Sequence, residues 1–521
     1  MGFMADSKIS TVQVIIFTDC SSKVFTRSIG AYEIASALRR NGYTVQVVDH
    51  FLLLGLERTL TILDKFVGPE TLFVGFSTTF MNLSTEHVGL EKAFDFTETT
   101  REGGGANAIN FTYGVPITDS DLDAIREKII GINPNTKLVM GGTKADFLSQ
   151  AQIDTFVIGY ADNVIVDYAK FLQGKNPFLQ YSSTARGQMI LDKDVNATGH
   201  DFVNSQTEFH ETDLIRPEEV LPIEISRGCI FRCKFCSFPL IGKKKNDHIK
   251  NKDIIYAEMM RNYEKFGTTK YVFADDTYNE SVEKLAHFAE AFARLPFKIE
   301  FVTYLRHDLI YRFPEMADLL KESGLKAGMF GLETLNHAAG KIIGKGLHPD
   351  KTREILTWLR EDKGWKNNIL LSSGFILGLP GETRDTISEW AEELTSFKYP
   401  LDSFNFFALA IGKPKKYGNK SEFENNFKDY GYYFDPAKST SWINEHWRFE
   451  DAVYMADVLH NYIHAISRSK THGFYSMMLQ NFGYTWEDIH SNSWKELIKR
   501  QDVFKHNIIR ADEYYDKLIK L

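Results

Sequence analysis

Three of the four cysteines in this 521-residue chain fall within one stretch of eight positions. They are Cys229, Cys233 and Cys236, and the fourth is Cys20. Three thiolates can ligate three irons of a [4Fe–4S] cube and leave the fourth iron open, whereas clusters that only carry electrons normally have four protein ligands. The spacing therefore predicts an iron–sulfur site that binds a reactant.

Zinc and disulfides are the less favoured alternatives for these thiols. A structural zinc needs four ligands, usually in two spaced pairs, and the sequence shows no second pair near the three cysteines. Disulfides are disfavoured by the odd local count, by the tight spacing and by the lack of an apolar secretory leader in Met1 to Ser10. We therefore expect a reducing compartment, the cytoplasm.

The motif CxxxCxxC, with the aromatic Phe235 before its last cysteine, resembles the signature of radical S-adenosylmethionine (SAM) enzymes. In that family the open iron is chelated by the amino and carboxylate groups of SAM. One electron then cleaves the sulfonium to give a 5′-deoxyadenosyl radical. The resemblance implies a [4Fe–4S] cluster, SAM and an external one-electron donor such as flavodoxin or ferredoxin.

Composition gives no signal for a membrane or nucleic-acid partner. No apolar run approaches the roughly 20 residues that span a bilayer. The formal net charge of −8 offers no global attraction to nucleic acid or anionic lipid. Lys243 to Lys245 form a compact basic run, which is more simply a solvated loop than a phosphate contact.

The N-terminal third, residues 1–180, alternates short β-branched runs with amphipathic helical patterns. This alternation predicts a doubly wound, Rossmann-like parallel sheet with its ligand beyond the carboxyl ends of the strands. The expected strands are Val12–Phe17, Thr44–Val48, Thr71–Phe76, Lys137–Met140 and Thr155–Ile158, with helices that include Ile29–Arg40 and Asp119–Ile130.

Small and hydroxylated residues follow these strands, which suits a broad ligand that approaches the backbone closely. The region resembles the cobalamin-binding domain that precedes one class of radical SAM enzymes, through Gly30–Leu38, Gly42–Val45 and the turn at Gly141-Gly142. The resemblance implies cobalamin contacts from Thr18, Asp19, Ser77, Thr78, Gly141, Gly142 and Gly159.

Two departures from that domain leave a vestigial site as the alternative. The loop that supplies a histidine to cobalt is absent, because the stretch reads Asp19-Cys20-Ser21-Ser22-Lys23. The usual Gly-Glu-Gly-Glu turn reads Gly159-Tyr160-Ala161-Asp162. Family members without the histidine still bind cobalamin, so the resemblance implies a cobalamin whose lower face is unligated.

Two segments break the strand and helix pattern. Residues 84–116 contain Gly103-Gly104-Gly105 and have the length of a functional lid or a disordered loop. Residues 181–216 are polar and aperiodic, and we expect an interdomain linker there.

The middle region, residues 217–412, predicts a partial (β/α)6 barrel with its chemistry at the carboxyl ends of the strands. The cysteines follow the first of these strands directly. The expected strands are Leu221–Ile225, Lys270–Ala274, Lys298–Tyr304, Ala327–Leu332, Leu370–Leu377 and Ser403–Leu409.

The later strand ends also match the radical SAM pattern, and the resemblance assigns them to SAM. Asp275, Asp276 and Thr277 would meet its amino group, Arg306 its carboxylate and Glu333 its ribose. The adenine would lie on the last motif, through Gly374, Ile376 and Gly378.

Residues 413–521 read mainly as helices, including Phe449–Ser467 and Trp494–His506, and the aromatic run Trp442–Trp447 would line a pocket or pack on the barrel. The whole pattern favours a cobalamin-dependent radical SAM methyltransferase that methylates an unactivated carbon. No catalytic residue is expected beyond the cluster ligands, since no Ser/His/Asp or paired-carboxylate set is apparent. The alternatives are a non-methylating radical reaction and a nonenzymatic sensor, and the sequence does not specify a substrate.

Overall fold

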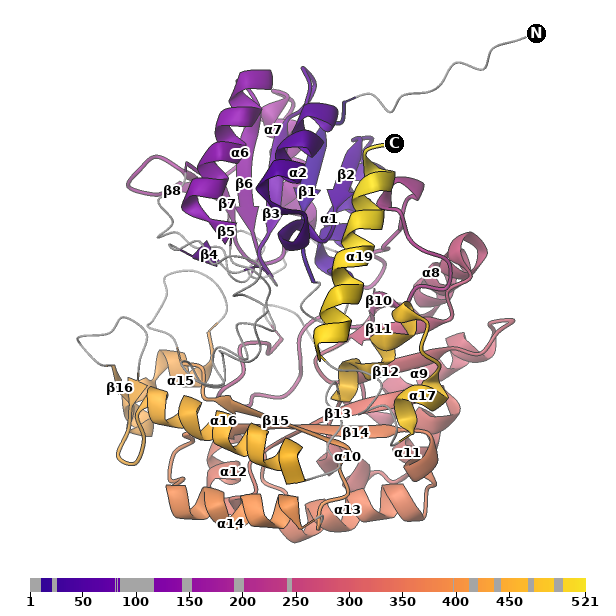
Figure 1. Ribbon diagram of the computed structural model, residues 1–521, viewed down its shortest axis with the longest axis vertical. Coiled ribbons are helices and arrows are strands. Elements are labelled where there is room, and N and C mark those ends of the chain that lie inside the picture. Colours follow the sequence, from indigo (N-terminus) through magenta and orange to yellow (C-terminus); the bar gives the residue numbers. More distant parts are fainter. Residues whose placement is uncertain are drawn as a thin grey trace.

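Two parallel sheets and a mainly helical C-terminal region make up the molecule (Figure 1). The predicted α/β fold class is confirmed. No described helix is long and apolar enough to cross a membrane. The computed structural model describes residues 11–20, 26–79, 81, 83–84, 117–142, 152–191, 201–240, 246–396, 398–411, 420–434, 442–466, 473–491 and 500–521.

The N-terminal sheet has the strand order β2-β1-β3-β6-β7-β9-β8, and only β8 runs antiparallel to its neighbour. Alternate residues of each strand point to opposite faces, so Val14 and Ile16 of β1 pack with one helix pair while Ile15 and Phe17 pack with the other. The strands are β1 (Val14–Phe17), β2 (Val45–Val48), β3 (Phe73–Ser77), β6 (Lys137–Gly141), β7 (Thr155–Val157), β8 (Ser182–Ser183) and β9 (Met189–Leu191).

Helices cover both faces of this sheet, as a doubly wound fold requires. One face carries α1 (Ile29–Arg40) and α7 (Asp162–Leu172), which contact each other. The other carries α2 (Phe51–Phe66) and α6 (Asp119–Ile132). Thr118 begins α6 with a capping box to Asp121, which explains why the helix starts where it does.

The predicted linker, residues 181–216, is partly wrong. Its first part forms β8 and β9, and β9 extends the sheet through parallel pairing of Ile190 with Phe156. These strands are too short for a period-2 pattern, and both β8 residues are exposed serines, so the sequence carried no strand signal. The N-terminal sheet therefore continues to Leu191.

Two further segments fall largely outside the described residues. Around the predicted insertion, β4 (Leu83–Ser84) pairs in parallel with β5 (Ile117–Thr118), so the chain leaves and re-enters at neighbouring positions. Residues 85–116 and the basic run Lys243 to Lys245 are not among the described residues.

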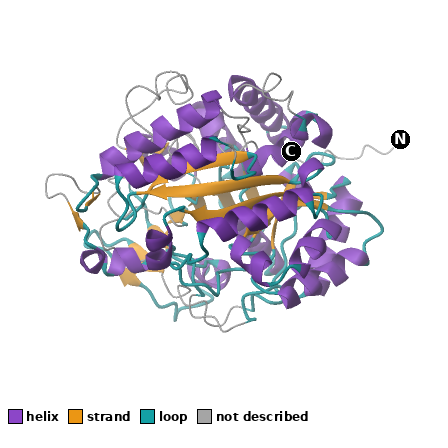
Figure 2. Cartoon of the chain, turned by 90° about the horizontal axis from the view of Figure 1, so that it is seen from below, coloured by secondary structure: helices purple, strands orange, loops and turns teal. Residues whose placement is uncertain are grey.

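The second sheet is a partial barrel whose six strands pair in sequence order, all parallel. Figure 2 shows these strands side by side with helices along them. The strands are β10 (Leu221–Glu224), β11 (Lys270–Ala274), β12 (Glu300–Leu305), β13 (Leu325–Glu333), β14 (Leu370–Leu377) and β15 (Ser403–Ala408). The helices between them are α8 (Lys252–Phe266), α9 (Val282–Ala293), α10 (His307–Arg312), α11 (Glu315–Glu322), α12 (His337–Ile343), α13 (Pro349–Glu361) and α14 (Arg384–Thr395).

The C-terminal region closes the barrel at two places. The helix α16 (Phe449–Ile466) packs on β15, the last strand of the partial barrel. The 3-10 segment η6 (Gly473–Phe482) packs against β12, β13, β14 and β15. Its Met477 and Met478 join a buried cluster with Val302 and Leu370, which closes the end of the barrel opposite the cysteines.

The final helix, α19 (Arg500–Leu518), leaves the barrel and lies along α2 of the N-terminal sheet (Figure 1). Its Tyr514 and Leu518 are buried in the core of that sheet. Arg58 of α2 pairs with Asp512, and Lys65 donates to the Ile519 carbonyl at 2.7 Å. The chain therefore ends on the domain with which it began.

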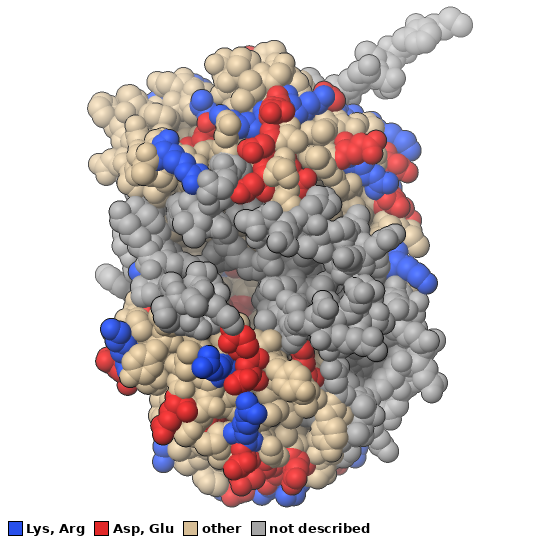
Figure 3. Space-filling view, turned by 60° about the vertical axis from the view of Figure 1, so that its left-hand side comes forward, with Lys and Arg blue, Asp and Glu red and all other residues tan. Residues whose placement is uncertain are grey.

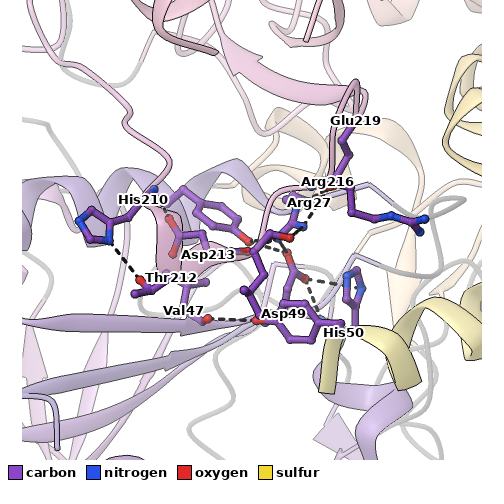
Figure 4. A network of polar contacts seen from close by, with 12 residues as sticks. Arg27, Val47, Asp49, His50, His210, Thr212, Asp213, Arg216 and Glu219 are labelled. Atoms are coloured by element: carbon purple, nitrogen blue, oxygen red, sulfur yellow. Dashed lines mark hydrogen bonds and ion pairs between the residues drawn. The ribbon is translucent and has the colours of Figure 1, made fainter. Parts of the chain in front are cut away.

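A buried polar network at the end of β2 joins the N-terminal sheet to the segment before β10 and to α19 (Figure 4). The guanidinium of Arg27 donates to Glu219 at 2.6 Å and to the hydroxyl of Tyr32, which donates to Asp49 at 2.9 Å. Burial raises the pKa of Asp49 to about 7, although Arg27 opposes that shift. The hydroxyl of Tyr514 accepts from the Asp49 backbone N–H and donates to the Val47 carbonyl.

We expect Tyr514→Phe to lower the free energy of unfolding by about 1–3 kcal/mol, because it leaves the buried Asp49 N–H without its acceptor. Urea unfolding followed by circular dichroism measures the change. The matched control is Tyr515→Phe on the same helix, whose ring stacks with Arg58 and would keep that contact. Equal losses in the two variants would contradict the role given to the Tyr514 hydroxyl.

Candidate active site

The carboxyl ends of the two sheets face each other. Tyr160 follows β7 of the N-terminal sheet, Arg227 follows β10 of the barrel, and the guanidinium lies 4.7 Å from the centre of the Tyr160 ring. On the face shown in Figure 3, basic and acidic side chains are interspersed over both described parts of the molecule. Ligands of both fold types bind at these strand ends, so the site lies between the two domains.

The cysteine loop begins directly after β10 and is held by backbone hydrogen bonds. Gly228 has φ +89°, a conformation that favours glycine, and turns the chain into the loop. The Cys229 N–H donates to the Phe238 carbonyl, and its own carbonyl accepts from Leu240. The Lys234 N–H donates to the carbonyl of Ile343 at the end of α12. The loop is thereby fixed at both ends and in the middle.

Each cysteine sulfur has a polar neighbour. The Sγ of Cys229 lies 3.3 Å from Thr277 Oγ1, Arg306 Nη1 donates to Cys233 Sγ at 3.4 Å, and the Phe238 N–H donates to Cys236 Sγ at 3.4 Å. Such neighbours stabilise thiolates, which is the form that ligates iron. Burial raises the pKa of the Cys236 thiol to about 12, so iron has to displace a proton there.

The arrangement fits a cube better than a single ion. Among the described residues, no three Cys, His, Asp or Glu side chains gather as the ligands of one metal ion. A structural zinc needs four ligands on one ion, whereas the three cysteines of a cube each bind a different iron. The donor set therefore fits the [4Fe–4S] cluster and disfavours the zinc alternative.

After β11 the three predicted SAM residues have different surroundings. Asp275 is buried and held by Lys284 at 2.8 Å and by the Thr277 N–H, so its carboxylate is committed to the protein. Asp276 is exposed, yet burial is the main cause that raises its pKa to about 7. Contact of Asp275, Asp276 and Thr277 with the SAM amino group stays a prediction.

Arg306, after β12, points at the cysteine loop. Asp308 accepts from it at 2.6 and 3.0 Å, and its guanidinium lies 4.2 Å from the centre of the Phe231 ring. With Nη1 on Cys233, the side chain is fixed beside the cluster position. A carboxylate bound to the open iron would lie near this cation, so the site fits the predicted contact with SAM.

Glu333 ends β13 in a backbone conformation that is rare for its residue type. Its φ is +68°, and the pairing of β13 with β14 shifts register between Gly331 and Glu333. A Cβ on Gly331 would lie 2.5 Å from the Glu333 carboxylate, which lies 3.6 Å from Lys345 Nζ. Bulges and positive φ values are frequent beside active sites, where they re-aim a side chain.

The glycine motif on β14 serves packing in a way that the sequence did not reveal. Gly378 has φ +87°, and a Cβ there would lie 2.3 Å from the indole of Trp442. Its carbonyl accepts from Tyr432 at 2.7 Å and from Asn444 at 3.2 Å. Trp442 thus fills the space on the side of Gly378 where a side chain would stand, and the predicted contact of Gly378 with adenine stays a prediction.

The other two residues of this motif, Gly374 and Ile376, lie among side chains of the barrel. Gly374 lies opposite Met329 and Phe407, whose side chains would be 3.2 and 3.5 Å from an added Cβ. Ile376 is 9% exposed. Trp442 and Trp447 are buried, so the alternative in which the aromatic run packs on the barrel describes these two residues.

Glu382 is a site residue to which the sequence motif gave no role. It is fully buried; one carboxylate oxygen accepts from Thr334 at 2.5 Å and the other from the Leu379 N–H at 3.3 Å. Thr334 directly follows Glu333, so Glu382 ties the end of β13 to the loop after β14. Burial raises the pKa of Glu382 to about 8.

At the N-terminal sheet, the predicted cobalamin residues line the carboxyl edge. Thr78 donates from its hydroxyl and its N–H to the Gly141 carbonyl, and Gly142, at φ +110°, lies so close that an added Cβ would be 3.1 Å from Thr78 N. Ser77 and Gly141 end the adjacent strands β3 and β6, and Gly159 has φ +83°. These small residues leave the strand ends without bulky side chains.

Two residues at the end of β1 complete this edge. Asp19 accepts from the Leu52 N–H at 2.9 Å and so caps the start of α2. The buried hydroxyl of Thr18 has no hydrogen-bond partner among the described residues. An edge of glycines with an unsatisfied hydroxyl fits a broad ligand with polar groups at its rim, as cobalamin is.

Comparison with known proteins agrees with this site. Residues 223–394 match the radical SAM superfamily. The anaerobic magnesium-protoporphyrin IX monomethyl ester cyclase of Cereibacter sphaeroides is 25% identical over 335 residues, which cover 60% of this chain and 52% of that one. The hopanoid C-2 methylase of Rhodopseudomonas palustris is 27% identical over 190 residues, which cover 35% of this chain and 34% of that protein.

A solved structure extends the similarity to the full fold. The radical SAM methyltransferase TsrM of Kitasatospora setae, with cobalamin and a [4Fe–4S] cluster bound, aligns over 96% of this chain and 100% of its own, with a TM-score of 0.59 and 15% identity. Residues 223–394 are therefore a radical SAM domain, of the superfamily whose cofactors are a [4Fe–4S] cluster and SAM. The fold of the chain is thus similar to that of TsrM over nearly its whole length. The chain spans about half or less of the length of the curated relatives named above.

Gly378→Ala tests the packing role of this glycine. We expect a loss of about 1 kcal/mol from the positive φ and a further 1–3 kcal/mol from the contact with Trp442. Gly381→Ala is the matched control, because it has φ +79° with open space around its Cβ and should show the first loss alone. The midpoints of denaturant unfolding measure the stability of both variants. Equal shifts in the two variants would show that the contact with Trp442 does not contribute to the loss.

The pKa of Glu382 predicts a pH dependence of stability. Between its ordinary value near 4.5 and about 8, the folded protein holds a proton that the unfolded chain has released. The free energy of unfolding should therefore fall as pH rises through this window, and Glu382→Gln should make that fall smaller. Urea unfolding at about pH 5.5 and about pH 8.5 measures the difference. The control is Glu392→Gln, which changes an exposed residue on α14. This variant should keep the pH dependence of the wild-type stability.

Proposed function

We propose that this protein is a cobalamin-dependent methyltransferase that methylates an unactivated carbon. The observation that carries the proposal is the meeting of two ligand edges: the cysteine loop and the SAM residues of the barrel face the small-residue edge of the N-terminal sheet. A substrate between the two edges lies within reach of both. When bound, the cluster and SAM supply a 5′-deoxyadenosyl radical, and cobalamin supplies a carried methyl group.

In this proposal the residues of the chain hold and orient the cluster, SAM and cobalamin. Cys229, Cys233 and Cys236 would hold the cluster. Arg306 would hold the carboxylate of SAM, and its amino group would lie against Asp275, Asp276 and Thr277. Glu333, fixed by the bulge and by Lys345, contacts the ribose hydroxyls. Thr18, Ser77, Thr78, Gly141, Gly142 and Gly159 hold the cobalamin. No proton-transfer residue is needed, because the hydrogen leaves the substrate as an atom.

A second candidate is a radical reaction without methyl transfer, in the same site. The relative from Cereibacter sphaeroides, which covers the larger part of this chain, is a cyclase. Cyclisation would need the same cluster and SAM contacts. The mass of the product separates the candidates, because only methyl transfer adds a methylene unit.

Two further expectations belong to this proposal. Reductive cleavage of SAM consumes one electron, so the cluster needs an external one-electron donor such as flavodoxin or ferredoxin. Cytoplasmic location suits the three free thiols of the loop.

The test is anaerobic production in cobalamin-supplied cells, followed by reaction with SAM whose methyl group is deuterated. We expect about four irons, the content of one cube, and near-stoichiometric cobalamin. Mass spectrometry should detect 5′-deoxyadenosine, S-adenosylhomocysteine and a deuterated methyl group on candidate substrates. A cluster without cobalamin, or a product that gains no methyl group, would contradict methyl transfer.

Two variants control this experiment. Cys233→Ala should abolish both the cluster absorption and 5′-deoxyadenosine, because the cube loses one of three protein ligands. Cys20→Ala changes a buried cysteine outside the loop and should leave the iron content unchanged. Equal iron loss in both variants would contradict the assignment of the loop cysteines as the cluster ligands.

A further inference from the structure

Arg227 joins the two domains at the residue that precedes the cysteine loop. Its guanidinium donates to Glu224 through Nε and Nη2, both at 2.7 Å, and to Asp162 through Nη1 at 2.7 Å and Nη2 at 3.3 Å. Glu224 ends β10 of the barrel, and Asp162 begins α7 of the N-terminal sheet. One side chain thus makes a bidentate contact in each domain.

Two aromatic rings fix the plane of this guanidinium. Tyr160 and Phe202 each have their ring centre 4.7 Å from the Arg227 Cζ. The guanidinium is flat and delocalised, so it stacks on rings while its edge donates to carboxylates. Arg227 is only 9% exposed, so the surrounding carboxylates and rings fix the position of its side chain.

Arg227 is connected through the backbone to Cys229, one of the predicted cluster ligands. Arg227 donates its backbone N–H to the His248 carbonyl, and the next residue, Gly228, turns the chain at φ +89° into Cys229. The Gly228 backbone also hydrogen-bonds the Asp276 carboxylate. A displacement of Arg227 therefore moves Cys229, one of the cluster ligands, and Asp276, a predicted SAM contact.

The contacts of Arg227 give a structural role to the altered turn Gly159–Asp162. The turn differs from the usual Gly-Glu-Gly-Glu at Tyr160, Ala161 and Asp162. Two of these residues, Tyr160 and Asp162, contact Arg227. The turn lies at the carboxyl end of β7, on the edge predicted to hold cobalamin. It faces the barrel, whereas Gly159 remains as the residue of the turn nearest to the strand end.

We infer that Arg227, Glu224, Asp162 and Tyr160 form a latch that holds the cysteine loop at a fixed position against the ligand edge of the N-terminal sheet. These are positioning residues, since Arg227 acts through Gly228 and Cys229. The inference rests on the proposed function only in assuming that both edges carry cofactors. The latch couples them, because a shift of either edge has to move or break a buried ion pair.

A second buried contact keeps the domains together when the latch is cut. Lys250 Nζ lies 2.9 Å from Glu33 of α1 and 3.3 Å from Glu258 of α8, and all three side chains are almost fully buried. The pair of Lys250 with Glu33 spans the same two domains and makes no hydrogen bond to Arg227, although Arg227 and Asp162 act on the charge of Glu33. A change at Glu33 therefore controls both for general loosening of the interface and for the loss of a nearby negative charge.

Hydrogen–deuterium exchange of the full-length, cluster-loaded protein tests the latch. In Asp162→Asn we expect exchange in peptides covering residues 226–240 to rise by about tenfold, because the loop loses one of its two anchors. In Glu33→Gln these peptides should stay within about twofold of wild type. Asp162→Glu, which keeps the carboxylate, should restore slower exchange. Peptides of α7 show whether the helix start itself has been lost.

The outcomes that overturn the latch are distinct from failure of the proposed function. Unchanged exchange at residues 226–240 in Asp162→Asn, or an equal rise in Glu33→Gln, would refute it. A spectroscopic readout follows in cobalamin-loaded protein: pulsed electron paramagnetic resonance between Co(II) and the reduced cluster should give a broader distance distribution in Asp162→Asn than in wild type. Protein that binds no cobalamin would contradict methyl transfer, while the exchange experiment would still decide the latch.

Discussion

The buried ion pairs between the N-terminal sheet and the barrel are the interaction on which the site depends. Parallel sheets bind ligands at their carboxyl edges, so two such sheets share a substrate only when those edges face each other. Arg227 with Asp162 and Lys250 with Glu33 hold that arrangement. Removing one member of a buried pair leaves a charge without its partner at a cost of about 3–5 kcal/mol, so these pairs resist separation of the domains.

The barrel edge is organised by local strain that its surroundings maintain. Glu333 adopts a positive φ at the bulge of β13, and such a conformation persists only where neighbours over-determine it. Those neighbours are Lys345, which contacts its carboxylate, and Glu382, which holds the following Thr334. The C-terminal region adds Trp442 over Gly378. Parts of the chain far apart in sequence thus converge to support one loop-rich edge.

Much of the fold followed from pattern, and the failures have identifiable causes. Buried parallel strands have largely apolar sequences, so β11 and β14 were predicted with their observed bounds. The strands β8 and β9 were missed because they are too short for a periodic signal. Asp275 and Asp276 are chemically alike and adjacent, and only the position of Lys284 reveals which of them is committed to the protein.

By itself, the sequence determined the chemistry: three thiols at CxxxCxxC spacing, two domains with alternating strands and helices, and the strand ends that carry polar residues. These are local properties, set by residue type and spacing. The tertiary structure alone decided how the two edges face each other, that Trp442 fills the space beside Gly378, and that the turn at Asp162 contacts Arg227. Such pairings join residues distant in the chain, and no local propensity encodes which distant partner a buried charge or an open glycine will meet.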